Sequence, residues 1–197
     1  MIKFLLIFFF FNGLFLMASE PWKLEKNSAG IKIYTRSIKN SNIKEFKAYA
    51  TINAPKSKVF FTLYKISDFV KWYPDIMESK TLKIINQVEK IIYYKIDVPW
   101  PADNRDMVLK LKVVRNRAKK ETIIYMKSIT GYKNKVSGIV RIKKAYGFWK
   151  LTADGNKTKV HYQFLANPGG SLPTWIINMF IVDSPFNTIK ALRKKVI

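Results

Sequence analysis

The sequence predicts an α+β fold in which a curved antiparallel β-sheet wraps around a long C-terminal α-helix. Two observations predict it. From residue 79 onward, segments with the periodicity of strands follow one another with only short turns between them, which is typical of an antiparallel sheet rather than of βαβ units. The end of the chain carries an apolar stripe at helical spacing. Such a stripe needs an apolar partner, and the concave face of the sheet provides one.

The first 18 residues predict a signal peptide. Lys3 supplies a positive charge, a mostly apolar run from Phe4 to Met17 follows, and Ala18 is a small residue suited to cleavage. The run is shorter than the about 20 apolar residues that a membrane-spanning helix needs. We therefore expect export to the periplasm or the medium, with cleavage after Ala18. An uncleaved N-terminal anchor is the alternative.

Residues 19–197 predict one folded domain. No internal repeat or low-complexity linker divides them, and 48% of the whole chain is hydrophobic and 15% aromatic, which suffices for a substantial core. The chain has no cysteine. Disulfides, thiolate chemistry and a cysteine-ligated zinc site are therefore excluded, and the fold depends on its core.

The first half of the domain predicts a hairpin followed by helix. Glu20 to Asn27 is expected to be a short helical or irregular lead-in, while Gly30–Arg36 and Ile43–Ile52 alternate as half-buried strands do. Pro55 then suits the first turn of a helix, whose apolar positions recur at helical spacing up to Tyr64. Asp68 to Asp75 is expected to be an aromatic turn or a second short helix.

The second half predicts a series of strands and a final helix. The helix is expected to begin with Ser171 as N-cap after two glycines, and Asp183-Ser184-Pro185 predicts a kink near Ser184. The expected strands are Thr81–Ile85, Lys90–Val98, Met107–Arg115, Thr122–Ile129, Ser137–Ala145, Gly147–Thr152 and Lys157–Ala166.

Two motifs carry a resemblance to a known family. Val98-Pro99-Trp100-Pro101-Ala102-Asp103-Asn104-Arg105-Asp106 resembles the Pro-Trp-Pro…Arg-Asp signature of START (StAR-related lipid-transfer) domains, and Asn167-Pro168-Gly169-Gly170-Ser171-Leu172-Pro173-Thr174-Trp175 resembles the approach to that family's long C-terminal helix. The order of elements also matches the helix-grip fold of this family. The resemblance implies a protein that binds a lipid or another hydrophobic molecule in an internal cavity, without a cofactor and without catalysis. It also implies that the Pro99-Trp100-Pro101 loop and the C-terminal helix close that cavity.

The expected cavity wall comes from two strands, the loop between them and the final helix. Pockets of this kind are mostly apolar, with a few polar groups that fix orientation. The candidate ligand-binding residues are Ile92, Tyr94, Ile96, Trp100, Arg105, Val108, Leu109, Leu111, Trp175, Ile176, Met179 and Phe180.

The sequence also predicts how charge is distributed around the cavity. Arg105 and Asp106 are neighbours on an extended segment, so they point to opposite sides and are not expected to pair with each other. Sterol-carrying START domains often hold an acid and an arginine inside the cavity, and ungapped comparison places Ile92 and Leu111 at these positions. The resemblance therefore implies an apolar cavity floor, which suits an acyl chain better than a sterol hydroxyl.

The formal net charge of +23 admits three readings. It favours a polyanionic partner such as nucleic acid or an anionic membrane surface, or it reflects a general abundance of lysine, isoleucine and asparagine. Export and the even scatter of lysines argue against nucleic acid, whereas a basic face suits anionic lipids. We expect a monomer, and a basic polyanion-binding or membrane-binding protein stays as one alternative function.

An enzyme of the helix-grip type, acting as a cyclase or hydrolase on a hydrophobic substrate, is the other alternative. His161 is the only histidine, and its strand alternation places it on the solvent side, away from Val160 and Tyr162. No metal-ligand spacing and no phosphate-binding glycine loop is present. Catalysis would then fall to carboxylates such as Asp97 or Asp106.

Overall fold

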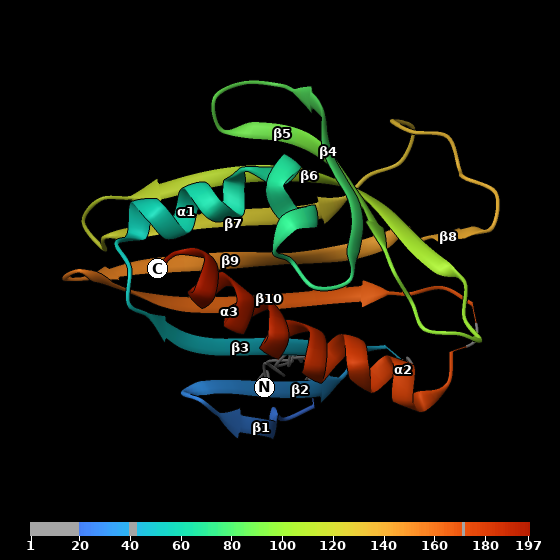
Figure 1. The fold of residues 1–197 in the computed structure, drawn as a ribbon, viewed down its shortest axis with the longest axis horizontal. Helices are drawn as coiled ribbons and strands as arrows, with labels where there is room; N and C mark the ends of the chain where they lie inside the picture. The colour runs from blue at the N-terminus through green and yellow to red at the C-terminus, as the bar shows by residue number, and fades with distance from the viewer. Residues whose placement is uncertain (1–19, 40–42, 171) are drawn as a thin grey trace, which may run out of the picture.

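The computed structural model describes residues 20–39, 43–170 and 172–197. The predicted signal peptide and Ser171 lie outside these residues. The described chain forms one ten-stranded sheet in the order β1-β2-β3-β10-β9-β7-β6-β5-β4, with β8 paired to β6 beside this path. The helices lie against one face of the sheet (Figure 1). The predicted α+β class, a curved antiparallel sheet around a C-terminal helix, is confirmed.

Three N-terminal strands form one side of the sheet. β2 (Ile31–Ser37) and β3 (Lys44–Ile52) are the predicted hairpin, and β1 (Lys23–Ser28) pairs antiparallel with β2. The prediction of a helical or irregular lead-in over Glu20 to Asn27 is therefore wrong. β1 is an edge strand that buries no residue and has a register shift between Leu24 and Lys26, so it lacks the alternation that marks a half-buried strand.

The remaining long strands continue the sheet with antiparallel neighbours. The first of them is β10 (Lys157–Asn167), which pairs with β3, and the last is β4 (Ile76–Ile84) at the far edge of the sheet. β4 starts five residues before the predicted strand Thr81–Ile85. Between β10 and β4 lie β9 (Lys144–Asp154), β7 (Glu121–Ser128), β6 (Asn104–Asn116) and β5 (Glu89–Ile96).

The predicted strand Ser137–Ala145 is divided in the structure. Its middle forms the short strand β8 (Ile139–Arg141), which pairs parallel with the start of β6, and its end becomes the start of β9. The sequence of β8 shows no alternation, because all three of its residues are half-buried. The parallel pairing extends β6 to Asn104. Arg105 and Asp106 pair with β5 as well as with β8, so they lie in a strand and not in the preceding loop.

Helix α1 (Lys56–Tyr64) follows the hairpin as predicted, with Pro55 at its N-cap. It buries Val59, Phe60 and Leu63, the positions that the apolar spacing indicates. A 3-10 helix, η1 (Ile66–Lys71), follows at once and buries Ile66 and Phe69. These two short elements cover one end of the concave face and lead into β4.

The C-terminal helix consists of three parts. α2 (Thr174–Asn178) has Pro173 and not Ser171 as its N-cap, η2 (Met179–Asp183) is a π-helical turn, and α3 (Ser184–Lys195) completes it. The predicted interruption near Ser184 therefore takes the form of a π turn that ends at Asp183. Within the described ranges, no helix combines the length and apolar character needed to cross a membrane.

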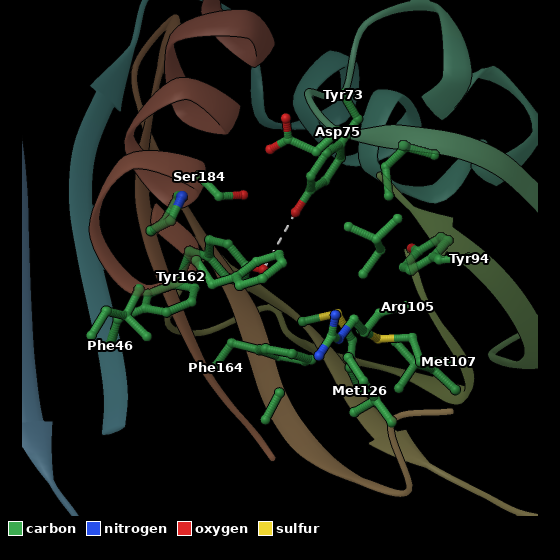
Figure 2. A pocket seen from close by; sticks show the side chains of 18 of the residues that line it. Phe46, Tyr73, Asp75, Tyr94, Arg105, Met107, Met126, Tyr162, Phe164 and Ser184 are labelled. Atoms are coloured by element: carbon green, nitrogen blue, oxygen red, sulfur yellow. Dashed lines mark hydrogen bonds between the residues drawn. The ribbon is translucent and has the colours of Figure 1, made fainter. Parts of the chain in front are cut away.

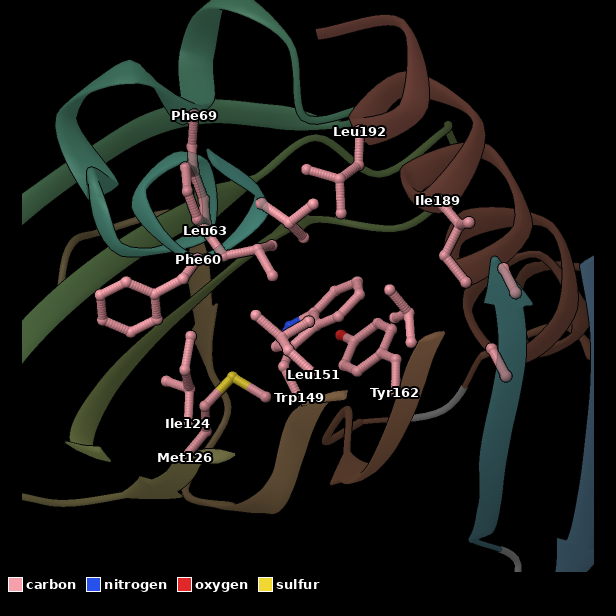
Figure 3. Close-up of a cluster of buried hydrophobic side chains, with 14 of the residues drawn as sticks. Phe60, Leu63, Phe69, Ile124, Met126, Trp149, Leu151, Tyr162, Ile189 and Leu192 are labelled. Atoms are coloured by element: carbon pink, nitrogen blue, oxygen red, sulfur yellow. The ribbon is translucent and has the colours of Figure 1, made fainter. Parts of the chain in front are cut away.

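The main core lies between the sheet and the helices (Figure 3). Leu63 and Phe69 from the first helical segments meet Ile189 and Leu192 from α3 over the central strands. Trp149 of β9 stacks on Tyr162 of β10, with ring centroids 3.8 Å apart. Toward the other end of the helix the side chains separate and leave a cavity.

Candidate functional site

The cavity has a volume of about 150 Å³ and lies between the concave face of the sheet and the first half of the C-terminal helix (Figure 2). Most of its wall is apolar. Its sheet side includes Phe46, Tyr94, Ile96, Arg105, Met107, Leu109, Leu111, Ile124, Met126, Trp149, Tyr162 and Phe164, and its helix side includes Ile177, Phe180, Ile181, Ser184 and Pro185.

Alternation along β6 decides which of its residues reach the cavity. Arg105, Met107, Leu109 and Leu111 line it, as expected for every second residue of a strand. Val108 points to the opposite face, where it packs with Ile91 and Tyr93 in a separate small cluster. Its place in the predicted wall was inconsistent with the alternation of its own strand.

Six of the predicted wall residues line the cavity and six do not. Those that line it are Tyr94, Ile96, Arg105, Leu109, Leu111 and Phe180. The others are absent from the lining: Ile92, Trp100, Val108, Trp175, Ile176 and Met179. Ile92 is fully buried in the core. The floor formed by Leu109, Leu111, Ile124 and Met126 is apolar, which agrees with the resemblance-based expectation.

The π turn explains the differences on the helix. Trp175 is 52% exposed, while Ile176 is fully buried next to residues that reach the cavity. The next fully or nearly buried position is Ile181, five residues later, which is the spacing of a π turn and not of an α-helix. An apolar stripe drawn at α-helical spacing therefore selects Trp175 and Met179 in place of Ile177 and Ile181.

The Pro99-Trp100-Pro101 segment forms a tight turn outside the cavity. The Ala102 N–H donates to the Pro99 carbonyl at 3.2 Å, and Trp100 at the tip of the turn is 88% exposed. The prolines remove backbone donors and hold the turn rigid. None of the three residues lines the cavity.

Sequence reasoning missed the wall residues contributed by β3, β7, β9 and β10. Ile124 and Met126 of β7, like Tyr162 and Phe164 of β10, are two positions apart and share the concave face. Alternation alone could have identified them once the order of strands in the sheet was known. Tyr73, by contrast, lies in an irregular segment before β4, and no sequence signal assigned it to the site.

A polar group of side chains lies where the cavity approaches the surface. The Tyr73 and Tyr162 hydroxyls are 3.4 Å apart, and burial raises the pKa of both phenols. Asp75 is exposed but lines the cavity. Neighbouring groups partly desolvate its carboxyl group and so raise its pKa, the Asp97 carboxylate raises the pKa further, and a hydrogen bond with Ser184 lowers it.

Arg105 and Asp106 point to opposite sides of the sheet, as predicted from their position on an extended segment. Asp106 lies 1% exposed on the outer side, where it accepts hydrogen bonds from Arg141 Nε at 2.5 Å and Arg141 Nη2 at 2.9 Å. Arg105 is 3% exposed and lines the cavity. The motif thus places one ion pair outside the cavity and one cation within it.

The residues named for the enzyme alternative do not come together. Asp97 is exposed, Asp106 is bound to Arg141, and His161 lies on the outer face of β10. None of the three lines the cavity. Within the described residues, no group of three or more His, Cys, Asp or Glu side chains could hold a metal ion.

His161 faces away from the cavity as predicted, but aromatic rings half-bury it. It stacks on Tyr49 at 4.4 Å and meets the Phe148 ring edge-on at 4.9 Å. Burial, together with the nearby Lys150 and Lys47 ammonium groups, lowers the pKa of His161 to about 4. The folded protein therefore holds this imidazole neutral at neutral pH.

Acidification should destabilise the fold partly through His161. The unfolded chain takes up the imidazole proton below pH 6.5, whereas the folded chain does so only near pH 4, so stability present above pH 6.5 is lost as the pH falls toward 4. His161→Phe keeps an aromatic ring and removes this proton. Urea unfolding at pH 7 and pH 4.5 should show a smaller loss of unfolding free energy in His161→Phe than in the wild type. Tyr49→Phe, which keeps the histidine, should lose as much as the wild type. Equal losses in all three proteins would contradict the role given to His161.

Comparisons with known proteins agree with this architecture. The family model of the START domain matches residues 12–196. A crystal structure of a STAR-related lipid transfer protein fragment from Xanthomonas axonopodis superposes with a TM-score of 0.81 at 34% identity, covering 89% of this chain and 98% of that one. An uncharacterized protein of Pseudomonas aeruginosa is 35% identical, over 89% of this chain and 86% of its own length. The human phosphatidylcholine transfer protein is 25% identical, over 90% of this chain and 85% of its own.

The family match covers nearly all of the described chain, and it includes the sheet, the cavity and the C-terminal helix that closes the concave face. The chain therefore belongs to the START domain family.

Proposed function

We propose that this protein binds one lipid molecule in the cavity between the sheet and the C-terminal helix, and carries it between membranes. The observation that supports this most directly is the apolar cavity itself, which a soluble domain of this size does not need for stability because empty space forfeits packing energy. Family membership and the phosphatidylcholine transfer relative support the same reading. We infer that the ligand is an acyl lipid.

The cavity must widen to accept such a ligand. Its volume of about 150 Å³ resembles that of an engineered cavity that admits benzene, far below the about 300–1,000 Å³ of ordinary ligand pockets. The C-terminal helix is the element suited to move. No side-chain hydrogen bond caps the N-terminus of α2, and the π turn interrupts the regular helix beside the cavity. Outward movement of α2 and η2 would displace Phe180 and Ile181 from the wall.

Membrane contact would supply the place for this movement. Trp100 and Trp175 are both strongly exposed aromatic residues in the segments predicted to close the cavity, and tryptophan favours the interface between water and lipid. The net charge of +23 favours anionic membrane surfaces. We propose that these residues contact the bilayer while the helix opens and the acyl chains enter by the hydrophobic effect.

Native mass spectrometry of the protein recovered from a bacterial periplasmic fraction tests the proposal. We expect the mass of a chain that begins at Ser19, with one lipid bound, and we expect transfer of that lipid between vesicles to be faster when they are anionic. Met126 lines the cavity and its neighbour Tyr125 is exposed on the other face. Met126→Trp should therefore lose the bound lipid, and Tyr125→Trp should keep it.

Three outcomes would contradict parts of this proposal. An empty wild-type protein that also binds no lipid from vesicles would contradict lipid carriage. A bound small molecule that is chemically changed on incubation would favour the enzyme alternative. Binding to anionic vesicles that disappears with salt and needs no acyl chain in the cavity would favour a basic surface-binding protein instead.

A further inference from the structure

Arg105 is a buried cation in an otherwise apolar row of side chains. It begins the inward-facing series on β6 that continues with Met107, Leu109 and Leu111, and all four line the cavity. Figure 2 shows Arg105 and Met107 among the side chains of the wall. We propose that Arg105 binds the phosphate or carboxylate group of the lipid, so that the ligand enters the cavity with its oxyanion at this end of β6. This inference rests on the proposed lipid-binding function and specifies the head group that the cavity selects.

The guanidinium of Arg105 is incompletely satisfied by the described residues. Its Nη1 donates to the Asp103 carbonyl and its Nη2 to the Gly169 carbonyl at 3.4 Å. Its Nε is buried and has no hydrogen-bond partner among the described residues. Asp103 is exposed and favours the charge from nearby, yet no carboxylate lies within ion-pair distance of Arg105 in the described chain.

The other well-buried guanidinium near this site has a different environment. Arg141 donates to Asp106 through both Nε and Nη2, and also to the Lys133 and Asn134 carbonyls. Asp106 raises the pKa of Arg141, whereas burial lowers the pKa of Arg105. A buried charge without a counterion is strongly destabilising. The protein therefore retains at Arg105 a cation that an incoming anion would stabilise.

The unused donors of Arg105 suit an oxyanion. A guanidinium binds carboxylates and phosphates through two parallel N–H groups, which gives both strength and orientation. The free Nε and the Nη2, whose bond to Gly169 is long, lie on adjacent positions of the guanidinium. An oxyanion at this edge would satisfy the unpartnered Nε and replace the weak bond to the Gly169 carbonyl.

The surroundings of Arg105 define where the rest of the ligand would lie. The carbonyl of Gly169, in the loop that precedes α2, keeps the side chain at the end of the cavity. From there the six residues to Leu111 extend roughly 20 Å along the strand, and each inward side chain on the way is apolar. Asp75 also lines the cavity but is acidic, so it disfavours an anionic group on its side. An acyl chain along Met107, Leu109 and Leu111 lies against the apolar row, and its oxyanion on Arg105 lies away from the acidic Asp75 side.

Paired ligands that differ only in the head group test this inference. The probes are oleate against oleyl alcohol, and dioleoyl phosphatidylcholine against dioleoylglycerol, each titrated into delipidated protein. Hydrogen bonds to a charged group predict about a ten- to hundredfold preference of the wild type for the oxyanion-bearing member of at least one pair. The pair that shows the preference identifies the oxyanion as a carboxylate or a phosphate.

Substitutions at Arg105 then separate charge from structure. Arg105→Gln should remove the preference while the neutral ligand binds as before, which also shows that the variant is folded. Arg105→Lys should retain part of the preference, and Arg117→Gln, which removes the same charge from an exposed turn, should retain all of it. An unchanged preference in Arg105→Gln would overturn the inference. Lipid binding without any preference in the wild type overturns this inference alone, whereas failure of all four ligands to bind overturns the proposed function with it.

Discussion

Asp106→Asn is expected to lower the free energy of unfolding by about 3–5 kcal/mol, the cost of breaking a buried ion pair by removing one partner. Asp106 is 1% exposed and Arg141 has a side chain that is only 9% exposed. The amide that replaces the carboxylate can accept from Arg141 but carries no charge. Arg141 would then keep its positive charge in a buried site without a counterion.

The position of this ion pair explains why breaking it should destabilise neighbouring segments as well as the two residues themselves. Arg141 ends β8, the short strand that pairs parallel with the beginning of β6. Its remaining donors hold the Lys133 and Asn134 carbonyls, so the pair also attaches the long connection before β8 to the sheet. A backbone hydrogen bond also joins this segment to β6, because the Ile142 N–H donates to the Asp106 carbonyl at 2.8 Å.

Urea unfolding monitored by circular dichroism measures the effect. Asp154→Asn is the matched control, because Asp154 pairs with Lys159 at 3.1 Å with both side chains more than half exposed, and such pairs contribute about 0–1 kcal/mol. The double variant Asp106→Leu, Arg141→Met should recover much of the stability, since it removes both charges. If Asp106→Asn unfolds within 1 kcal/mol of the wild type, the pair is not a principal support of β6 and β8.

The elements that sequence reasoning predicted well carry a strong strand signal of their own. β7 and β10 alternate between buried and more exposed residues, the pattern that one-sided burial imposes. β5 and β6 each contain five consecutive buried residues, and such a run is typical of a strand that is buried on both faces. β1 and β8 have no such signal, because the first is an exposed edge and the second is three half-buried residues. Their pairing partners lie elsewhere in the chain, and only the folded arrangement reveals them.

The candidate site shows the same division. Leu109 and Leu111 could be assigned from one strand, whereas the wall residues of β7, β9 and β10 required the order of strands in the sheet. Val108 could have been excluded by alternation alone. The choice between Trp175 and Ile177 depended on the π turn, which inserts an extra residue into the helix without a sequence signal that we recognise.

The charge distribution within the motif could be predicted only in part. Neighbouring residues on a strand point apart, so the separation of Arg105 and Asp106 followed from backbone geometry. Which of them faces the cavity depended on the register of β6 against β5, where Arg105 pairs with Ile96. The partner of Asp106 lies 35 residues later in the sequence, and no local pattern indicated it.

A covalent link between β1 and the C-terminal helix is expected to stop lipid uptake and release. Lys26 on β1 forms an ion pair with Asp183 at the end of the π turn, at 2.9 Å. Its ammonium group also lies 4.3 Å from the centre of the Phe186 ring in α3. These contacts join the sheet edge to the part of the helix next to the cavity. The cavity is too small for an acyl lipid while that part stays in place, so a link at this position would block the required movement.

The absence of cysteine from the chain makes the experiment specific. In the variant Lys26→Cys, Asp183→Cys, a short cleavable bismaleimide can join only the two new thiols. Exchange of a fluorescent phospholipid between vesicles and the linked protein should fall to the level of the residual unlinked fraction, and cleavage of the linker should restore it. The proposed helix movement acts as a gate through which the ligand both enters and leaves. Lipid that is loaded before the link is made should therefore remain bound.

A matched link away from the helix separates gating from a general effect of crosslinking. Lys159 and Asp154 form an ion pair on the β9–β10 hairpin, and cysteines linked at these positions should leave exchange unchanged. If the Lys26–Asp183 link also leaves exchange unchanged, the C-terminal helix near Asp183 is not the gate. Access would then have to come from the side of the Pro99-Trp100-Pro101 loop, where the exposed Trp100 already reaches outward. The two links therefore decide which of the two predicted covers has to move for a lipid to enter.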